Sequence, residues 1–135
     1  MYRTHIYITL STDTPAVADR KWAYLMTIEG HEKTASCSGN IRASRHAATL
    51  TALASALDRY RQPAQITVHA EDAWVLHTMR DALEKWASGG WKTAKGEEIK
   101  DRALWEHVWK KSRYKKMLIK TERHAHTDAL KEAMR

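Results

Sequence analysis

The chain has 135 residues, of which 43% are hydrophobic and 29% charged. These proportions exclude wholesale disorder and fit a single domain over residues 1–135. Lysine and arginine total 23 against 16 aspartates and glutamates, so the net charge of +7 favours polyanionic partners. The longest apolar runs are only a few residues long, which excludes a transmembrane helix and predicts no membrane partner. The single cysteine, Cys37, excludes a disulfide framework and favours a reducing, cytoplasmic compartment.

Alternating apolar and polar residues predict β-strands in the first third of the chain. Ile6, Ile8 and Leu10 alternate with polar neighbours, and this period of two is typical of a strand rather than of a signal peptide. We expect Gly39 and Asn40 to end this β-section. The three expected strands cover residues 4–10, 21–29 and 31–38, and the last two form a hairpin.

Helical spacing begins after the three strands. Ser44 predicts the cap of a helix that runs to Arg59, because Leu50, Leu53 and Leu57 recur on one helical face. The order of elements predicts a mixed sheet with helices packed on it. The remaining expected elements are a strand over residues 65–70, a helix from Val75 toward Trp86, a helix capped by Asp101, a strand over residues 115–121 and a short helix capped by Thr127.

The second half of the chain contains a specific pattern beside a Gly-Gly break. Residues Gly90-Trp91-Lys92-Thr93-Ala94 are followed at fixed spacing by Gly96, Ile99, Leu104 and Trp105. This pattern, together with the element order and residues 65–75, resembles the type 1 ribonuclease H family. The resemblance implies an α/β fold with a mixed five-stranded sheet of order 3-2-1-4-5, three antiparallel strands followed by parallel ones. It also implies a metal-dependent endoribonuclease that cleaves RNA in RNA–DNA hybrids.

The chemistry implied by this resemblance needs four carboxylates that hold two Mg²⁺ or Mn²⁺ ions about 4 Å apart. We expect these positions to meet at the carboxyl ends of the strands, where the sites of α/β sheets gather. In chain order, the four positions fall on Thr9 or Leu10, on Thr49, on Glu71 and on Asp128. Only Glu71 and Asp128 are acidic, so two of the four implied ligands are missing.

Two neighbouring residues bear on the activity of this site. Asp13 is the carboxylate nearest to the first position and becomes a substitute ligand if its turn brings it beside Glu71 and Asp128. His124 falls where the family carries a mobile histidine. Glu71, Asp128 and nearby histidines could hold one ion, for which Mn²⁺ suits mixed ligands best. The alternative is that both acids are exposed at helix starts, where a carboxylate stabilises the helix dipole.

Basic and aromatic residues predict nucleic-acid-binding surfaces in two segments. Around the Gly-Gly break they are Lys85, Trp91, Lys92 and Lys95, and near a helix end they are Lys110, Lys111 and Arg113. The alternative is a solvated basic face with tryptophans packed between helices, and we expect Trp86, Trp105 and Trp109 to belong to the core. Four histidines are expected around the site, as metal ligands or as exposed side chains, namely His46, His69, His124 and His126.

Three functions from different classes follow. The first is a ribonuclease H-like pseudoenzyme that binds an RNA–DNA hybrid or duplex without cleaving it. The second is a divergent ribonuclease H that uses Mg²⁺ or Mn²⁺. The third is a protein-interaction module on the same fold, whose basic surface takes an acidic protein. A strong salt dependence of duplex binding distinguishes the first from the third, and metal-dependent cleavage distinguishes the second from both.

Overall fold

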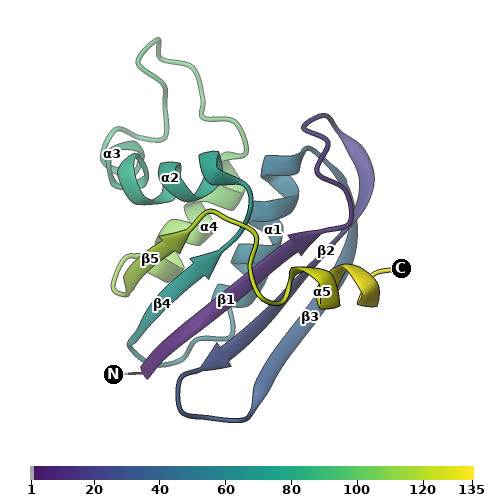
Figure 1. The fold of residues 1–135 in the computed structure, drawn as a ribbon. Coiled ribbons are helices and arrows are strands. Elements are labelled where there is room, and N and C mark those ends of the chain that lie inside the picture. Colours follow the sequence, from purple (N-terminus) through teal and green to yellow (C-terminus); the bar gives the residue numbers. More distant parts are fainter. Residues whose placement is uncertain (1) are drawn as a thin grey trace.

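A computed structural model describes residues 2–135, and its centre is a five-stranded sheet (Figure 1). The strands are β1 (Tyr2–Leu10), β2 (Ala18–Ile28), β3 (Thr34–Ala43), β4 (Ala64–His69) and β5 (Lys116–Lys120). Their order in the sheet is β3-β2-β1-β4-β5. The pairs β1–β2 and β2–β3 are antiparallel, whereas β4 pairs with β1 and with β5 in parallel. The expected order and pairing of the strands are therefore confirmed.

Helices lie on both faces of the sheet (Figure 1). They are α1 (Arg45–Leu57), α2 (Ala73–Asp81), α3 (Leu83–Ser88), α4 (Arg102–Ser112) and α5 (Thr127–Ala133). Ser44 caps α1 as expected, because its side chain accepts a hydrogen bond from the Ala47 amide. The single helix expected from Val75 toward Trp86 is instead two helices, which meet at Ala82. Within residues 2–135, no helix is long and apolar enough to span a membrane.

The expected end of the third strand is wrong, because β3 continues through Gly39 and Asn40 to Ala43. Gly39 lies opposite Trp22 in the β2–β3 ladder. A Cβ at Gly39 would lie 2.6 Å from the Trp22 ring, so glycine lets the indole cover the strand. The glycine that looked like a strand end is therefore a packing requirement inside the strand.

One expected helix cap is confirmed in position and another is wrong. Asp101 is the N-cap residue of α4, in a left-handed conformation with φ 59°, but its side chain makes no cap hydrogen bond. Thr127 is the first residue of α5, whose cap residue is His126. The Thr127 hydroxyl accepts a bond from the His124 amide, and so it closes the preceding turn.

The core lies between the sheet and α1. Leu50, Leu53 and Leu57 of α1 are completely buried, as their helical spacing predicts. They belong to one apolar cluster with alternate residues of β1 and β4. Successive strand residues point to opposite faces, so the residues between them point away from α1. On that second face, α5 packs on β1 and β2.

Candidate functional site

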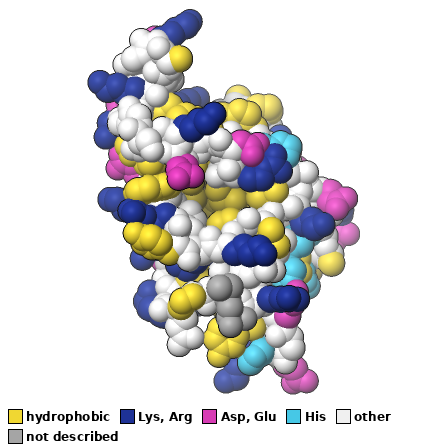
Figure 2. Space-filling view, turned by 90° about the vertical axis from the view of Figure 1, so that its left-hand side faces the viewer, with side chains coloured by type: hydrophobic (Ala, Val, Ile, Leu, Met, Phe, Trp, Pro, Cys, Tyr) yellow, Lys and Arg dark blue, Asp and Glu magenta, His cyan; other side chains and the backbone are white. Residues whose placement is uncertain are grey.

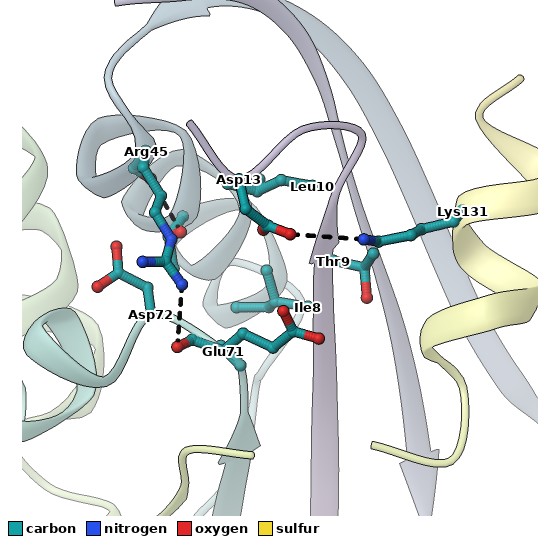
Figure 3. A pocket seen from close by; sticks show the side chains of 10 residues that line it. Ile8, Thr9, Leu10, Asp13, Arg45, Glu71, Asp72 and Lys131 are labelled. Atoms are coloured by element: carbon teal, nitrogen blue, oxygen red, sulfur yellow. Dashed lines mark hydrogen bonds and ion pairs between the residues drawn. The ribbon is translucent and has the colours of Figure 1, made fainter. Parts of the chain in front are cut away.

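The carboxyl ends of β1 and β4 form one edge of the sheet. The two strands are parallel, with Tyr7 opposite His69, so the residues that follow them meet at this edge. A small pocket of about 10 Å³ lies there (Figure 3). It is lined by Ile8, Thr9, Leu10, Asp13, Arg45, Thr49, Ala70, Glu71, Asp72 and Lys131. The structure thus brings together the first three of the four positions singled out in the sequence.

Leu10 and Thr49 occupy two of those positions without offering a charge. Leu10 is 5% exposed and packs in the apolar core. Thr49 is 1% exposed, and its hydroxyl donates to the Arg45 carbonyl at 2.9 Å. Thr9, the other reading of the first position, has its hydroxyl 3.1 Å from His124 Nε2.

Glu71 and Asp72 follow β4 but have different environments. Figure 3 shows the Glu71 side chain extending past Ile8 toward the side of the pocket where Thr9 lies. The Asp72 carboxylate is buried and caps α2 by accepting from the Val75 amide at 3.2 Å. Its second oxygen lies 2.6 Å from His46 Nδ1. Asp72 is therefore held by structural contacts, whereas the neighbouring Glu71 carboxylate also lines the pocket.

Two cationic side chains also enter this pocket, and the sequence patterns did not single out either one. Lys131 reaches in from α5 and places Nζ 3.5 Å from Asp13 Oδ2. Arg45 donates from Nη2 to the Glu71 carbonyl at 3.1 Å. Both contacts are drawn in Figure 3. Asp13 does lie beside Glu71, but its charge is balanced by the Lys131 ammonium.

Asp128, the fourth position, does not line the pocket. It stands on α5, and its carboxylate forms an ion pair with Arg123. The side chain is 84% exposed, so it fits the alternative of an exposed acid at a helix start. It also lies one turn before Lys131, whose side chain is the one from α5 that enters the pocket.

His124 lies beside the first position, as the sequence suggested. Its Nε2 donates to the Ile8 carbonyl at 2.9 Å, and its Nδ1 accepts from the His126 amide at 3.1 Å. These two bonds fit a neutral ring protonated on Nε2. Burial is the largest influence on this side chain and lowers the pKa of His124 below its usual value.

The residues at this edge do not fit the two metal ions that the fold family implies. Two of the four implied ligand positions hold the neutral side chains of Leu10 and Thr49. Asp128 points to Arg123, and the Lys131 ammonium enters the space beside Asp13. Within residues 2–135, no three His, Cys, Asp or Glu side chains converge on a point that could hold an ion. Divalent ions need several converging oxygen ligands, and this edge lacks them.

The other histidines separate onto two faces. His46 stacks on Trp74, with ring centroids 4.5 Å apart, on the α1 side of the edge. On the opposite face, Tyr7 stacks on His69 at 4.3 Å and lies 4.5 Å from the His126 ring. His5, which the sequence reading missed, places Nδ1 2.8 Å from His69 Nε2. The alternation of β1 could have revealed it, because His5 and Tyr7 share a face.

The environment of His69 lowers its pKa strongly. Burial lowers its pKa to about 4, and the nearby His5, His124, Lys120 and His126 act in the same direction. The imidazole is therefore neutral in the folded protein at neutral pH. A neutral ring can donate from Nε2 to His5 Nδ1, while His5 Nε2 faces Glu29 Oε1 at 3.0 Å.

The first predicted nucleic-acid-binding segment forms a protrusion between α3 and α4, residues 89–101, which extends away from the sheet (Figure 1). The backbones of Lys92 and Glu98 form an isolated antiparallel β-bridge. The side chains of Lys92 and Lys95 are both exposed. Figure 2 shows lysine or arginine side chains at the tip of this protrusion. Lys85, on α3, is exposed near its base.

Trp91 differs from the sequence expectation of a stacking residue. Its side chain is 8% exposed and meets Trp109 edge to face at 6.2 Å. The Trp91 backbone, with φ 63°, bonds to Trp86 and Ile99 and so fixes the base of the protrusion. The indole is therefore unavailable to a nucleic acid, because helix packing buries it. Trp86, Trp105 and Trp109 pack with the core as expected.

The second predicted segment is only partly free. Lys110 and Arg113 are exposed, and the Arg113 guanidinium lies 4.3 Å from the centre of the Trp109 ring. Lys111 is half-buried, with Nζ 3.7 Å from Asp58 Oδ1. Lys110 and Arg113 therefore remain candidates for phosphate contacts, and Lys111 has an intramolecular partner.

Comparison of the sequence with known proteins identifies a family. The sequence model named RNase H matches residues 7–131. Ribonuclease HI of Xylella fastidiosa (strain Temecula1) is 32% identical over 87 residues, which cover 64% of this chain and 57% of that protein. Ribonuclease H of Bordetella pertussis is 29% identical over 85 residues, which cover 63% of this chain and 54% of that protein. The matched segment thus spans little more than half of these relatives.

Solved structures with a similar fold cover nearly the whole chain. The RNase H domain of PFV, the prototype foamy virus, has a TM-score of 0.70 at 18% identity, covering 99% of this chain and 92% of that chain. LC11-RNase H1, solved in complex with RNA/DNA hybrid, has a TM-score of 0.63 at 15% identity, covering 94% of this chain and 92% of that chain. At these identities, the likeness shows a shared fold.

Proposed function

Because the chain belongs to the ribonuclease H family, we propose that it binds RNA–DNA hybrids and no longer cleaves them by the two-metal route. The observation that carries this proposal is the chemistry of the sheet edge. Two of the four carboxylates that two ions need are replaced by buried Leu10 and Thr49, and a lysine ammonium enters the same pocket. The edge keeps the strand arrangement of the family, but it lacks half of the carboxylates that the two-metal chemistry needs.

The exposed lysines of the protrusion support binding. Lys92 and Lys95 stand away from the sheet on a segment whose base is fixed by Trp91. Lysine contacts to phosphates release counterions, so each contact strengthens binding most at low salt. Such contacts position a duplex without reading its sequence. Lys85, Lys110 and Arg113 extend the same chemistry along α3 and the end of α4.

The test combines binding and cleavage on one labelled RNA–DNA hybrid. We expect the protein to raise the fluorescence anisotropy of the labelled hybrid equally in Mg²⁺, in Mn²⁺ and in a chelator. We also expect the RNA strand to stay intact. Lys95→Ala should weaken binding and reduce the salt slope by about one. Lys21→Ala, which removes an exposed lysine of β2, is the matched control and should change neither quantity.

A second candidate, a divergent nuclease, is supported by the position of Asp13. Asp13 and Glu71 line the same pocket, so a substrate that displaced Lys131 would leave two carboxylates for one ion. Cleavage that requires Mn²⁺ and disappears in Glu71→Ala would establish this candidate and contradict the first. If the anisotropy of the labelled hybrid did not rise at any salt concentration, both candidates would be contradicted. The remaining function would then be that of a protein-interaction module.

A further inference from the structure

An apolar pocket lies at the end of the sheet opposite the candidate site. It occupies about 330 Å³ between the β2–β3 hairpin, the start of β1 and the turn from α1 to β4. Ligand pockets usually measure about 300–1,000 Å³, so this volume fits a small ligand. The lining residues are Tyr2, Thr4, Met26, Thr27, Ile28, Lys33, Thr34, Ala35, Arg59, Tyr60, Arg61, Gln62, Pro63 and Ala64.

Two tyrosines give this pocket aromatic walls. Tyr2 is exposed at the start of β1, and Tyr60 follows α1. The Tyr60 hydroxyl lies 2.6 Å from Thr4 Oγ1, which fixes its ring against the first strand. Burial raises the pKa of Tyr60, so the phenol stays neutral. A flat ligand can therefore pack on a ring that is already held in place.

All charged residues that line this pocket are positive. They are Lys33 in the hairpin and Arg59 and Arg61 in the turn after α1. Arg59 is oriented by Tyr24, because its Nε donates to the Tyr24 hydroxyl at 2.6 Å. Arg61 is oriented by one bond from Nη1 to the Asp58 carbonyl. Three cations without a carboxylate among the lining residues favour an anion that carries more than one charge.

We propose that this pocket binds a mononucleotide, with the base against Tyr2 and Tyr60 and the phosphate near Lys33, Arg59 and Arg61. Gln62 lines the wall and offers hydrogen bonds to the base and the ribose. An acyl chain would cover the Gln62 amide without pairing it, which is unfavourable. The inference stands apart from the hybrid-binding function, because no residue of this pocket belongs to the candidate site.

The same chemistry occurs in a free nucleotide and in the phosphorylated end of a strand. The test therefore has two arms, calorimetric titration of the full chain with adenosine monophosphate and with a short 5′-phosphorylated single strand. Saturable binding in either arm is expected. Arg61→Glu should weaken this binding about tenfold or more by reversing one of three attractive charges. Lys21→Glu, a charge reversal of an exposed β2 residue outside the pocket, should change it less than about twofold.

A steric variant separates the pocket from general attraction to a basic protein. Ala35 lies opposite Met26 in the β2–β3 ladder and lines the same pocket, so Ala35→Trp places an indole in the pocket and should abolish binding. Circular dichroism verifies that both variants remain folded. Equal losses in Arg61→Glu and Lys21→Glu would overturn the proposal, since charge alone would then explain binding. Saturation by decanoate but by neither nucleotide ligand would overturn it as well.

Discussion

His46 Nδ1 lies 2.6 Å from Asp72 Oδ2, and this contact ties the first turn of α1 to the cap of α2. The two residues are 26 positions apart in the chain. Because the Asp72 carboxylate also accepts from the Val75 amide, both of its oxygens are occupied. The acid nearest to Glu71 is thereby committed to holding two helices together.

We therefore expect Asp72→Ala to lower the free energy of unfolding by about 1–3 kcal/mol, through the lost cap and the lost buried bond. Urea denaturation measures the change. Glu71→Ala is the control, because the neighbouring side chain has no such bonds, and it should stay within about 0.5 kcal/mol of the wild type. Equal losses in the two variants would contradict the structural assignment of Asp72.

The histidine cluster predicts a pH dependence of stability. The pKa of His69 falls from its usual 6.5 to about 4 in the folded protein, mainly through burial. Between these values the unfolded chain binds a proton that the folded chain does not, so stability decreases as the pH falls below 6.5 toward 4. His69→Gln should flatten this part of the profile, measured by urea denaturation at several pH values. An unchanged slope in the variant would contradict the prediction.

The contact of Gly39 with Trp22 predicts a large effect from one methyl group. In Gly39→Ala the new Cβ would lie 2.6 Å from the Trp22 ring, so the indole must move. We expect a loss of about 1–3 kcal/mol, as in other overpacked cores, measured by thermal denaturation. Gly30→Ala tests specificity, because no atom lies within 4 Å of its added Cβ and only its positive φ opposes the change.

Trp91 and Lys92 are neighbours whose substitutions should act on different quantities. Trp91→Ala removes a buried indole at the base of the protrusion and should cost about 3–5 kcal/mol of stability. Lys92→Ala should leave the melting temperature nearly unchanged and weaken hybrid binding, most strongly at low salt. Melting curves and salt-dependent anisotropy of both variants measure the two effects. Weakened binding by a stably folded Trp91→Ala would instead identify its indole as a contact residue.

Restoring the missing carboxylates tests the reading of the sheet edge. The wild-type Tm should be the same in Mn²⁺ and in a chelator, because few ligands converge. In the double variant Leu10→Asp/Thr49→Glu, two buried carboxylates should lower the Tm in chelator. Mn²⁺ should then recover part of the loss by binding the folded state only. An Mn²⁺-dependent rise in the wild-type Tm would show that the present residues already suffice.

The sequence by itself determined most of the fold. The alternation in β1 and the leucine spacing of α1 predict these elements whatever packs around them. The reason is that each period marks the face of the element that is buried away from water. The pattern from Gly90 to Trp105 indicates the family, and the resemblance already places the neutral residues Leu10 and Thr49 at two of the four ligand positions. Element ends were less certain, as Gly39 shows, because a glycine can end a strand or accommodate a neighbouring ring.

Only the tertiary structure decided what surrounds the sheet edge. Asp13 and Lys131 are 118 positions apart, and nothing in local spacing predicts that they pair. Asp128 turns toward Arg123 and Trp91 turns inward, although both were read as functional residues. Their contacts depend on how helices dock on the sheet, and docking follows from the packing of the whole core. The charges that line a pocket therefore depend on residues far apart in the sequence. The conformation of each helix or strand depends on residues close together in the sequence.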